Sequence, residues 1–325
     1  MSRTLLITLV VVGIPALQVG YAVLLEFLLR LVPQERVRWL LRPWLWLAPA
    51  LVLLSVFLLY PAINTLYLSL LGPDSRHIVG LSNYLFAFTS PEMLVAFRNN
   101  LLWLVLFTGL TVTLGVAMAV LSDRVRYESL AKSVLFLPMA ISFVAAGVIW
   151  KFVYEFRPLG LPQIGLLNAA LVSALPGFEP VAWLVRPPGN TLALILVATW
   201  VWTGFCLVIL SAALKGIPGD LLEAARVDGA TEWQVFWHVM IPHLASTITV
   251  VATTMVIYAL KAFDVVYVMT NGNFETEVIA NRMYKEMFNF RDFGRASAIA
   301  VILFAATIPV MVANIRRFRQ QEAVR

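Results

Sequence analysis

The chain has 325 residues, of which 61% are hydrophobic and 13% are charged, and its mean hydropathy is +0.85. Soluble globular domains usually have about 45–50% apolar and about 25% charged residues, so this composition excludes most soluble folds. The single cysteine, Cys206, cannot form an intrachain disulfide. The net charge of +6 does not require nucleic-acid binding, because Lys and Arg mark cytoplasmic loops in membrane proteins.

Apolar segments long enough, or nearly long enough, to cross a bilayer recur along the whole chain. In chain order they are Leu5–Leu29, Trp44–Leu71, Leu101–Leu121, Val134–Tyr154, Thr191–Leu214, Leu244–Thr270 and Ala296–Ile315. A spanning helix needs about 20 predominantly apolar residues, and these segments lack the alternating pattern of a membrane barrel. The sequence therefore predicts an all-α integral membrane protein with about seven transmembrane helices.

The first apolar segment has two interpretations. Ser2-Arg3 before an apolar run is compatible with a signal peptide. The run is long, contains Glu26 and has no clear small-residue cleavage site, which favours a retained helix.

The positive charges predict an orientation, because cytoplasmic connections carry the excess of Lys and Arg. One set of connections holds thirteen such residues and the opposite set holds eight. The richer set comprises Arg30, Arg36, Arg38, Arg42, Arg124, Arg126, Lys132, Lys215, Arg226, Arg316, Arg317, Arg319 and Arg325. We therefore expect a cytoplasmic C-terminus and, with an odd number of spans, an external N-terminus.

The longest cytoplasmic connection between spans, Lys215–Pro242, predicts two short helices joined by a tight bend. Pro218 suits the start of a helix, and Gly229 suits the bend because glycine readily adopts positive φ. The connection is acidic on the side where loops are normally basic. Its charged residues are Asp220, Glu223, Asp228 and Glu232 against Lys215 and Arg226. A helix resting on lipid headgroups usually has a basic polar face, so this surface suits docking to a soluble partner better.

The second helix of this connection has its own start and stop signals. Thr231 and Gln234 have capping-box spacing, and Pro242 should end the helix before the next span. The spacing of the apolar side chains predicts one apolar face. These side chains are Trp233, Phe236, Trp237 and Met240.

The connection resembles the EAA loop of ABC-importer permeases of the carbohydrate-uptake family. The resemblance rests on Glu223, Ala224, Ala225, Asp228, Gly229 and Ala230, followed by Ile241-Pro242. Flanking matches are Leu137-Pro138, Leu214-Lys215, Ile217-Pro218, Phe263-Asp264, Thr270-Asn271-Gly272 and Phe293-Gly294 with Ala296-Ser297-Ala298. Within the family, the extra N-terminal span and the lack of a large outer domain are most similar to the α-glucoside and glucosylglycerol permeases.

The resemblance implies a multi-pass permease subunit in a bacterial inner membrane. It implies residues 1–43 as an extra helix with a cytoplasmic linker, and 44–325 as the permease domain, with the coupling loop at 215–242. The implied partners are a second permease subunit, two ATPase subunits that hold ATP and Mg²⁺, and an external solute-binding protein. No cofactor, metal or catalytic residue is expected in this chain, and the sequence has no phosphate-binding Gly-rich loop.

Candidate solute contacts also follow from the resemblance, by alignment with the maltose-transporter permease. They are Met139, Phe143, Trp202, Phe205, Tyr258 and Ala262. Asparagines of that permease are replaced by alanines here and a glycine by Trp202, so maltose itself is not expected. Lys261 is a further candidate because charge inside a span is costly. It either lies near the solute path or pairs with Asp264, three residues further along the same helix.

The sequence leaves the solute open. A sugar or glycoside is favoured, and glycerol phosphate or another non-sugar solute is an alternative for the same class of permease. Whether this subunit or the second permease binds the solute is also open. A stand-alone secondary transporter would often show two similar halves, and an integral membrane enzyme would need a cluster of reactive side chains; neither is visible.

Overall fold

The computed structural model describes residues 3–323, with side chains from Val11 to Arg316 apart from Ile14. The chain forms two compact units, 1–65 and 66–325. Helix α3 (Tyr60–Leu68) crosses this boundary. In the described residues, every named secondary-structure element of both units is a helix.

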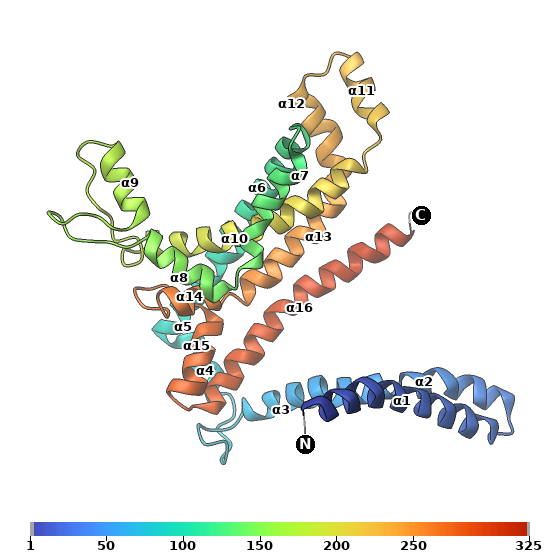
Figure 1. The fold of residues 1–325 in the computed structure, drawn as a ribbon. Coiled ribbons are helices and arrows are strands. Elements are labelled where there is room, and N and C mark those ends of the chain that lie inside the picture. The colour runs from blue at the N-terminus through green and yellow to red at the C-terminus, as the bar shows by residue number, and fades with distance from the viewer. Residues whose placement is uncertain (1–2, 324–325) are drawn as a thin grey trace. The chain divides into compact units, whose positions relative to one another are not determined.

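The first unit is a pair of helices, α1 (Arg3–Arg30) and α2 (Glu35–Leu54), which run side by side (Figure 1). The Tyr21 hydroxyl donates to the carbonyl oxygen of Leu45. Arg42 Nη2 lies 2.6 Å from Glu26 Oε1, so the carboxylate inside the first apolar segment has a partner. After α2 the chain continues through the π turn η1 (Ser55–Leu59) into α3.

The second unit is a helical bundle, and its elements follow one another along the chain. They are α4 (Ser82–Thr89), α5 (Pro91–Leu102), η2 (Trp103–Phe107), α6 (Thr108–Asp123), α7 (Glu128–Phe136), η3 (Leu137–Ala140), α8 (Phe143–Val153), α9 (Leu166–Ala174), α10 (Gly189–Lys215), α11 (Gly219–Val227), α12 (Glu232–Val235), η4 (Phe236–Met240), α13 (Ile241–Leu260), α14 (Asp264–Met269), α15 (Ile279–Tyr284), η5 (Lys285–Asn289) and α16 (Phe293–Ala323).

Helix α10 forms the centre of this bundle, between α6, α7, α8 and α13 (Figure 1). Its Leu194, Leu207 and Leu210 are fully buried. A helix that is apolar all round belongs in the interior, which explains why α10 has side chains buried around much of its circumference. The core brings α10 together with Trp103 and Phe107 from the π turn before α6.

Six described helices are long and apolar enough to cross a membrane, and a bent pair makes a seventh. This confirms the expectation of about seven spans. One expected span, Val134–Tyr154, is not a single helix. Instead, Glu128–Ala140 and Phe143–Val153 meet at an angle of 100°. Pro138 lies in a 3₁₀ turn, and the Ser142 side chain caps α8 by accepting from Ala145 N, so the chain ends one helix and starts another.

The expected span Leu244–Thr270 is also wrong in its second half. Helix α13 ends at Leu260, and Asp264 begins the separate helix α14. Lys261 is the C-cap of α13, so Lys261 and Asp264 do not lie on one helix. No ion pair joins them in the described part of the chain.

The end of α13 is stabilised by a side chain from α5. Asn100 Nδ2 donates to the carbonyl oxygens of Ala259 and Leu260, each at 3.3 Å, and Asn100 Oδ1 accepts from Ile279 N at 2.8 Å. The last carbonyls of a helix lack partners within the helix. Asn100 supplies partners there, and this explains how the span can stop inside an apolar segment.

Candidate functional site

The coupling loop (215–242) lies at the end of the second unit where α11 and α12 project, and Figure 1 shows this end. Helix α11 follows Pro218, whose extended backbone places it at the N-cap, one residue before the first helical residue. Gly229 has a φ of +85°, as its sequence context predicts. Its N–H donates to Arg226 O at 3.0 Å, and Ala230 N donates to Ala225 O at 3.0 Å. The positive φ therefore closes α11 with bonds to its last carbonyls.

The predicted capping box is present at the start of α12. Thr231 Oγ1 accepts from Gln234 N at 3.3 Å, and Gln234 Oε1 accepts from Thr231 N at 2.8 Å. These two bonds satisfy backbone donors that an unsupported helix start would leave free. Local hydrogen bonds and backbone geometry thus define the start of α11, the bend at Gly229 and the start of α12.

The prediction that Pro242 ends the second helix is wrong. Residues Glu232–Leu260 form one 29-residue helix, with the π turn η4 in front of the proline. Ile241 N donates to Phe236 O, five residues back. The wider turn accommodates the proline, whose missing N–H then costs a single bond at the start of α13.

The predicted apolar face of the second helix is also wrong, because the π turn changes which side chains share a face. Trp233 and Trp237 are exposed, at 69% and 48%, whereas Met240 is 5% exposed. Val235, which the spacing did not indicate, is fully buried with Met240 against Leu214, Ile217 and Leu244. A five-residue turn places Val235 and Met240 on one side, so the 3.6-residue period assumed from the sequence does not apply.

Three aromatic side chains of the second helix form a cluster in which Trp233 and Trp237 are exposed and Phe236 is half-buried. The ring centroid of Trp233 lies 5.8 Å from that of Phe236 and 5.7 Å from that of Trp237. Phe236 and Trp237 are 5.1 Å apart. The cluster is well placed to form the apolar part of a docking surface.

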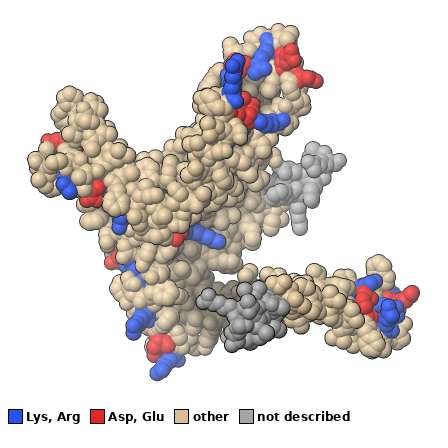
Figure 2. All heavy atoms as spheres, in the orientation of Figure 1, with Lys and Arg blue, Asp and Glu red and all other residues tan. Residues whose placement is uncertain are grey.

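The charges of the loop are partly compensated within the chain. Glu232 lies 2.8 Å from Arg226 and 2.5 Å from Arg124, and its carboxylate raises the pKa of Arg226. Asp220, Glu223 and Asp228 are not in any ion pair among the described residues, and all three are exposed. Figure 2 shows both signs of charge gathered at this end. The carboxylates of Asp220, Glu223 and Asp228 are therefore available to a basic group outside the chain.

The remaining residues of the predicted motif have structural positions. Ala224 is exposed on α11, while Ala225 and Ala230 are half-buried against the small core that contains Leu214 and Val235. Small side chains at these two positions let α11 lie close to the end of α10 and the start of α12. The motif thus combines an exposed carboxylate with a tightly folded support.

Four of the predicted solute contacts come together in the bundle. Phe143 lies 6.1 Å from Trp202 and 5.3 Å from Tyr258, between ring centroids. Trp202 lies 5.5 Å from Phe205 and 5.0 Å from Tyr258. Phe107 joins this aromatic cluster at 5.2 Å from Tyr258, and no motif in the sequence had indicated it.

The other three predicted contacts are placed differently. Met139 lies in η3, at the bend before α8, and Ala262 is buried in the core that includes the aromatic cluster. Lys261 is exposed at the end of α13. The structure therefore groups the aromatic candidates and leaves Lys261 outside that group.

Comparison with known proteins fits this arrangement. Residues 111–323 match the sequence family described as binding-protein-dependent transport system inner membrane component. The chain belongs to this family. It is therefore the membrane-spanning permease subunit of an importer of the ATP-binding-cassette class.

Two relatives are especially similar. The osmoprotective compounds uptake permease protein GgtC of Synechocystis sp. is 61% identical over 281 residues, covering 86% of this chain and 100% of GgtC. The α-glucoside transport system permease protein AglF of Rhizobium meliloti is 47% identical over 277 residues, covering 85% of this chain and 82% of AglF.

The fold also matches a solved structure. A chain of a bacterial ABC transporter involved in the import of the acidic polysaccharide alginate superposes with a TM-score of 0.72 and 24% identity. The match covers 88% of this chain and 99% of that chain. The helical arrangement is thus that of an importer permease.

Proposed function

We propose that this permease carries a sugar or a glycoside, such as an α-glucoside or glucosylglycerol, across the inner membrane. The observation that carries the proposal is the 61% identity to a permease for osmoprotective compounds, together with the 47% identity to an α-glucoside permease. The aromatic cluster of Phe143, Trp202 and Tyr258 supports it, because aromatic faces pack well against the C–H surfaces of sugar rings.

The driving force comes from separate ATPase subunits that dock on the coupling loop. Glu223 on α11 offers an exposed carboxylate, and Trp233 on α12 offers an exposed ring in the same loop. The ATPase subunits bind ATP and Mg²⁺, and this chain supplies no nucleotide-binding motif. A second permease subunit and an external solute-binding protein complete the complex. The permease domain spans 44–325, and the coupling loop and C-terminus face the cytoplasm.

The solute can be identified by reconstitution of the complete complex in proteoliposomes. ATP hydrolysis is measured with the binding protein and a panel that contains α-glucosides, other disaccharides, glucosylglycerol and glycerol phosphate. We expect stimulation by a glycoside from this panel and no stimulation by glycerol phosphate. Stimulation by glycerol phosphate alone would contradict the proposed solute class while leaving the permease assignment intact.

A further inference from the structure

Two ion pairs connect the α6–α7 turn and the first residue of α7 to the coupling loop, one at the start of the loop and one at the start of its second helix. Arg124, the C-cap of α6, lies 2.5 Å from Glu232, the first residue of α12. Glu128, the first residue of α7, lies 2.6 Å from Nζ of Lys215, the last residue of α10. A displacement of the coupling loop therefore reaches the α6–α7 turn at two separate points.

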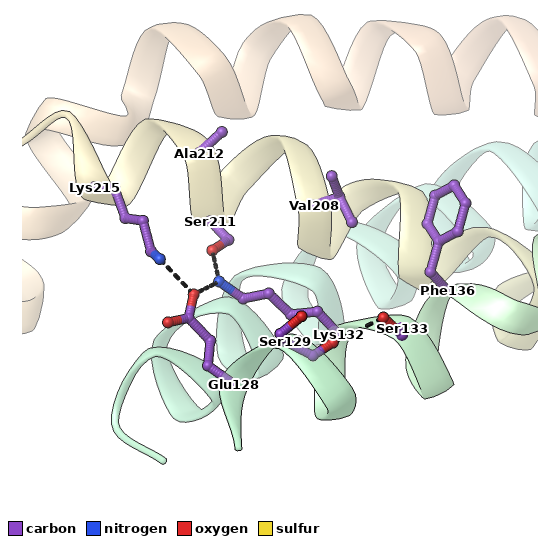
Figure 3. A pocket seen from close by; sticks show the side chains of 9 residues that line it. All are labelled: Glu128, Ser129, Lys132, Ser133, Phe136, Val208, Ser211, Ala212 and Lys215. Carbon is purple, nitrogen blue, oxygen red and sulfur yellow. Dashed lines mark hydrogen bonds and ion pairs between the residues drawn. The ribbon is translucent and has the colours of Figure 1, made fainter. Parts of the chain in front are cut away.

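Glu128 is the centre of the second connection. Figure 3 shows Lys132 and Lys215 both directed at its carboxylate. Lys132 Nζ also donates to Ser211 Oγ, so α7 and α10 share a polar contact one turn before the coupling loop. An open pocket of about 640 Å³ lies along the two helices here, lined by these side chains together with Phe136, Val208 and Ala212. At this end α7 is thus held by polar contacts beside an open pocket.

The other end of α7, where Phe136 also lines the pocket, comes into close backbone contact with α10. A Cβ on Gly204 would lie 2.5 Å from Leu135 O and 2.6 Å from Phe136 Cα, so only glycine permits this approach. A helix that is fixed near one end and held by polar contacts at the other can pivot about the fixed end. Movement of Glu128 would then turn α7 about its contact with Gly204.

Beyond its contact with Gly204, the chain continues from α7 to the aromatic cluster. Helix α7 continues into η3, and the 100° bend places Phe143 at the first turn of α8. Phe143 contacts both Trp202 and Tyr258. A continuous chain of contacts therefore runs from the coupling loop through Glu128 and α7 to these rings.

We propose that Glu128 and Arg124 are positioning residues that transmit movement of the coupling loop to the bend before α8. The proposal rests on the proposed function, because the loop must dock the ATPase subunit for this movement to occur. All four charged groups of the two pairs are partly exposed. Exposed ion pairs add little to stability, so these pairs can break and re-form during transport while they still set the direction of movement.

A double-mutant cycle tests the relay in the reconstituted complex. The variants are Glu128→Gln, Lys215→Gln and the double variant, with Lys215→Arg as the conservative replacement. The readout is the ratio of solute-stimulated to basal ATP hydrolysis, with pull-down of the ATPase subunit in parallel. We expect each single Gln variant to lower the ratio about fivefold, a typical size for coupling between sites. The double variant should be no worse than either single one, and Lys215→Arg should keep the ratio near that of the unmodified protein.

Arg126→Gln is the matched control, because Arg126 is an exposed cation of the same turn with no ion pair among the described residues. It should leave the ratio unchanged. Normal ratios in both single Gln variants, or independent losses that multiply in the double variant, would overturn the relay. Failure of the proposed function has a different signature: the unmodified complex itself would bind no ATPase subunit or show no stimulation by any solute.

Discussion

The ring of Tyr258 lies 5.0 Å from the ring of Trp202, between centroids. Trp202 belongs to α10 and Tyr258 to α13, the two helices that flank the coupling loop in the chain. The contact therefore joins the helices that enter and leave the loop. Phe143 from α8 adds a third helix to the same group.

Substitution of these rings should change solute preference. We expect Trp202→Ala or Tyr258→Ala to change the relative rates at which different glycosides stimulate ATP hydrolysis, because each variant removes a ring that we propose faces the solute. The expected change is roughly tenfold, equivalent to about 1.4 kcal/mol. Assembly of the complex should be retained. Trp200→Ala is the control, since Trp200 is on the same helix but contacts Trp150 instead. Unchanged preference in both cluster variants would assign the solute site to the second permease subunit.

Gly204 should be required for the packing of α7 on α10. A methyl group at this position would meet the backbone of Leu135 and Phe136, so Gly204→Ala should destabilise the protein by about 1–3 kcal/mol. Thermal unfolding in detergent measures the effect. Gly109→Ala is the control, because a Cβ built there would meet no neighbouring side chain or other element within 4 Å. Equal melting temperatures for the two variants would show that α7 does not approach α10 this closely.

The orientation can be tested by cysteine labelling in right-side-out vesicles. The excess of Lys and Arg predicts that Gln320→Cys reacts with an impermeant maleimide only after the membrane is opened. Ser173→Cys, on the exposed side of α9 in a predicted outer connection, should react at once. Cys206 is buried, so its background labelling should be small. Labelling of position 320 in sealed vesicles would reverse the orientation.

Much of the architecture can be predicted from the sequence because it depends on composition and local signals. Apolar length gives the spans, and Thr231 with Gln234 gives the capping box that the structure contains. Gly229 also has its expected positive φ. These features depend on single residues or on averages over about 20 residues, and distant contacts do not alter them.

Breaks and register shifts could not be predicted in this way. Hydropathy averages do not show that Ser142 starts a new helix or that Asn100 ends α13 from another part of the chain. The π turn before Pro242 adds a residue to the helical period, and this moved Val235 into the buried face. The aromatic cluster gained Phe107 for the same general reason, because tertiary packing and not spacing brings it to Tyr258.

The coupling loop is the feature on which the whole account depends. Gly229→Val would force a β-branched residue to a φ near +85°, at a cost of about 1–3 kcal/mol in local strain, and would redirect α12 with its exposed rings. Glu223→Lys replaces the exposed negative charge of α11 with a positive charge. Gly219→Ala is the matched control in the same loop, because its φ is not positive and the space beside it is open.

Pull-down of the ATPase subunit, combined with solute uptake at equal membrane levels of each variant, is the decisive measurement. We expect Gly229→Val and Glu223→Lys to insert normally and to lose ATPase binding and uptake, while Gly219→Ala retains both. If Gly229→Val and Glu223→Lys bind the ATPase subunit and transport at the normal rate, segment 215–242 is not the coupling loop.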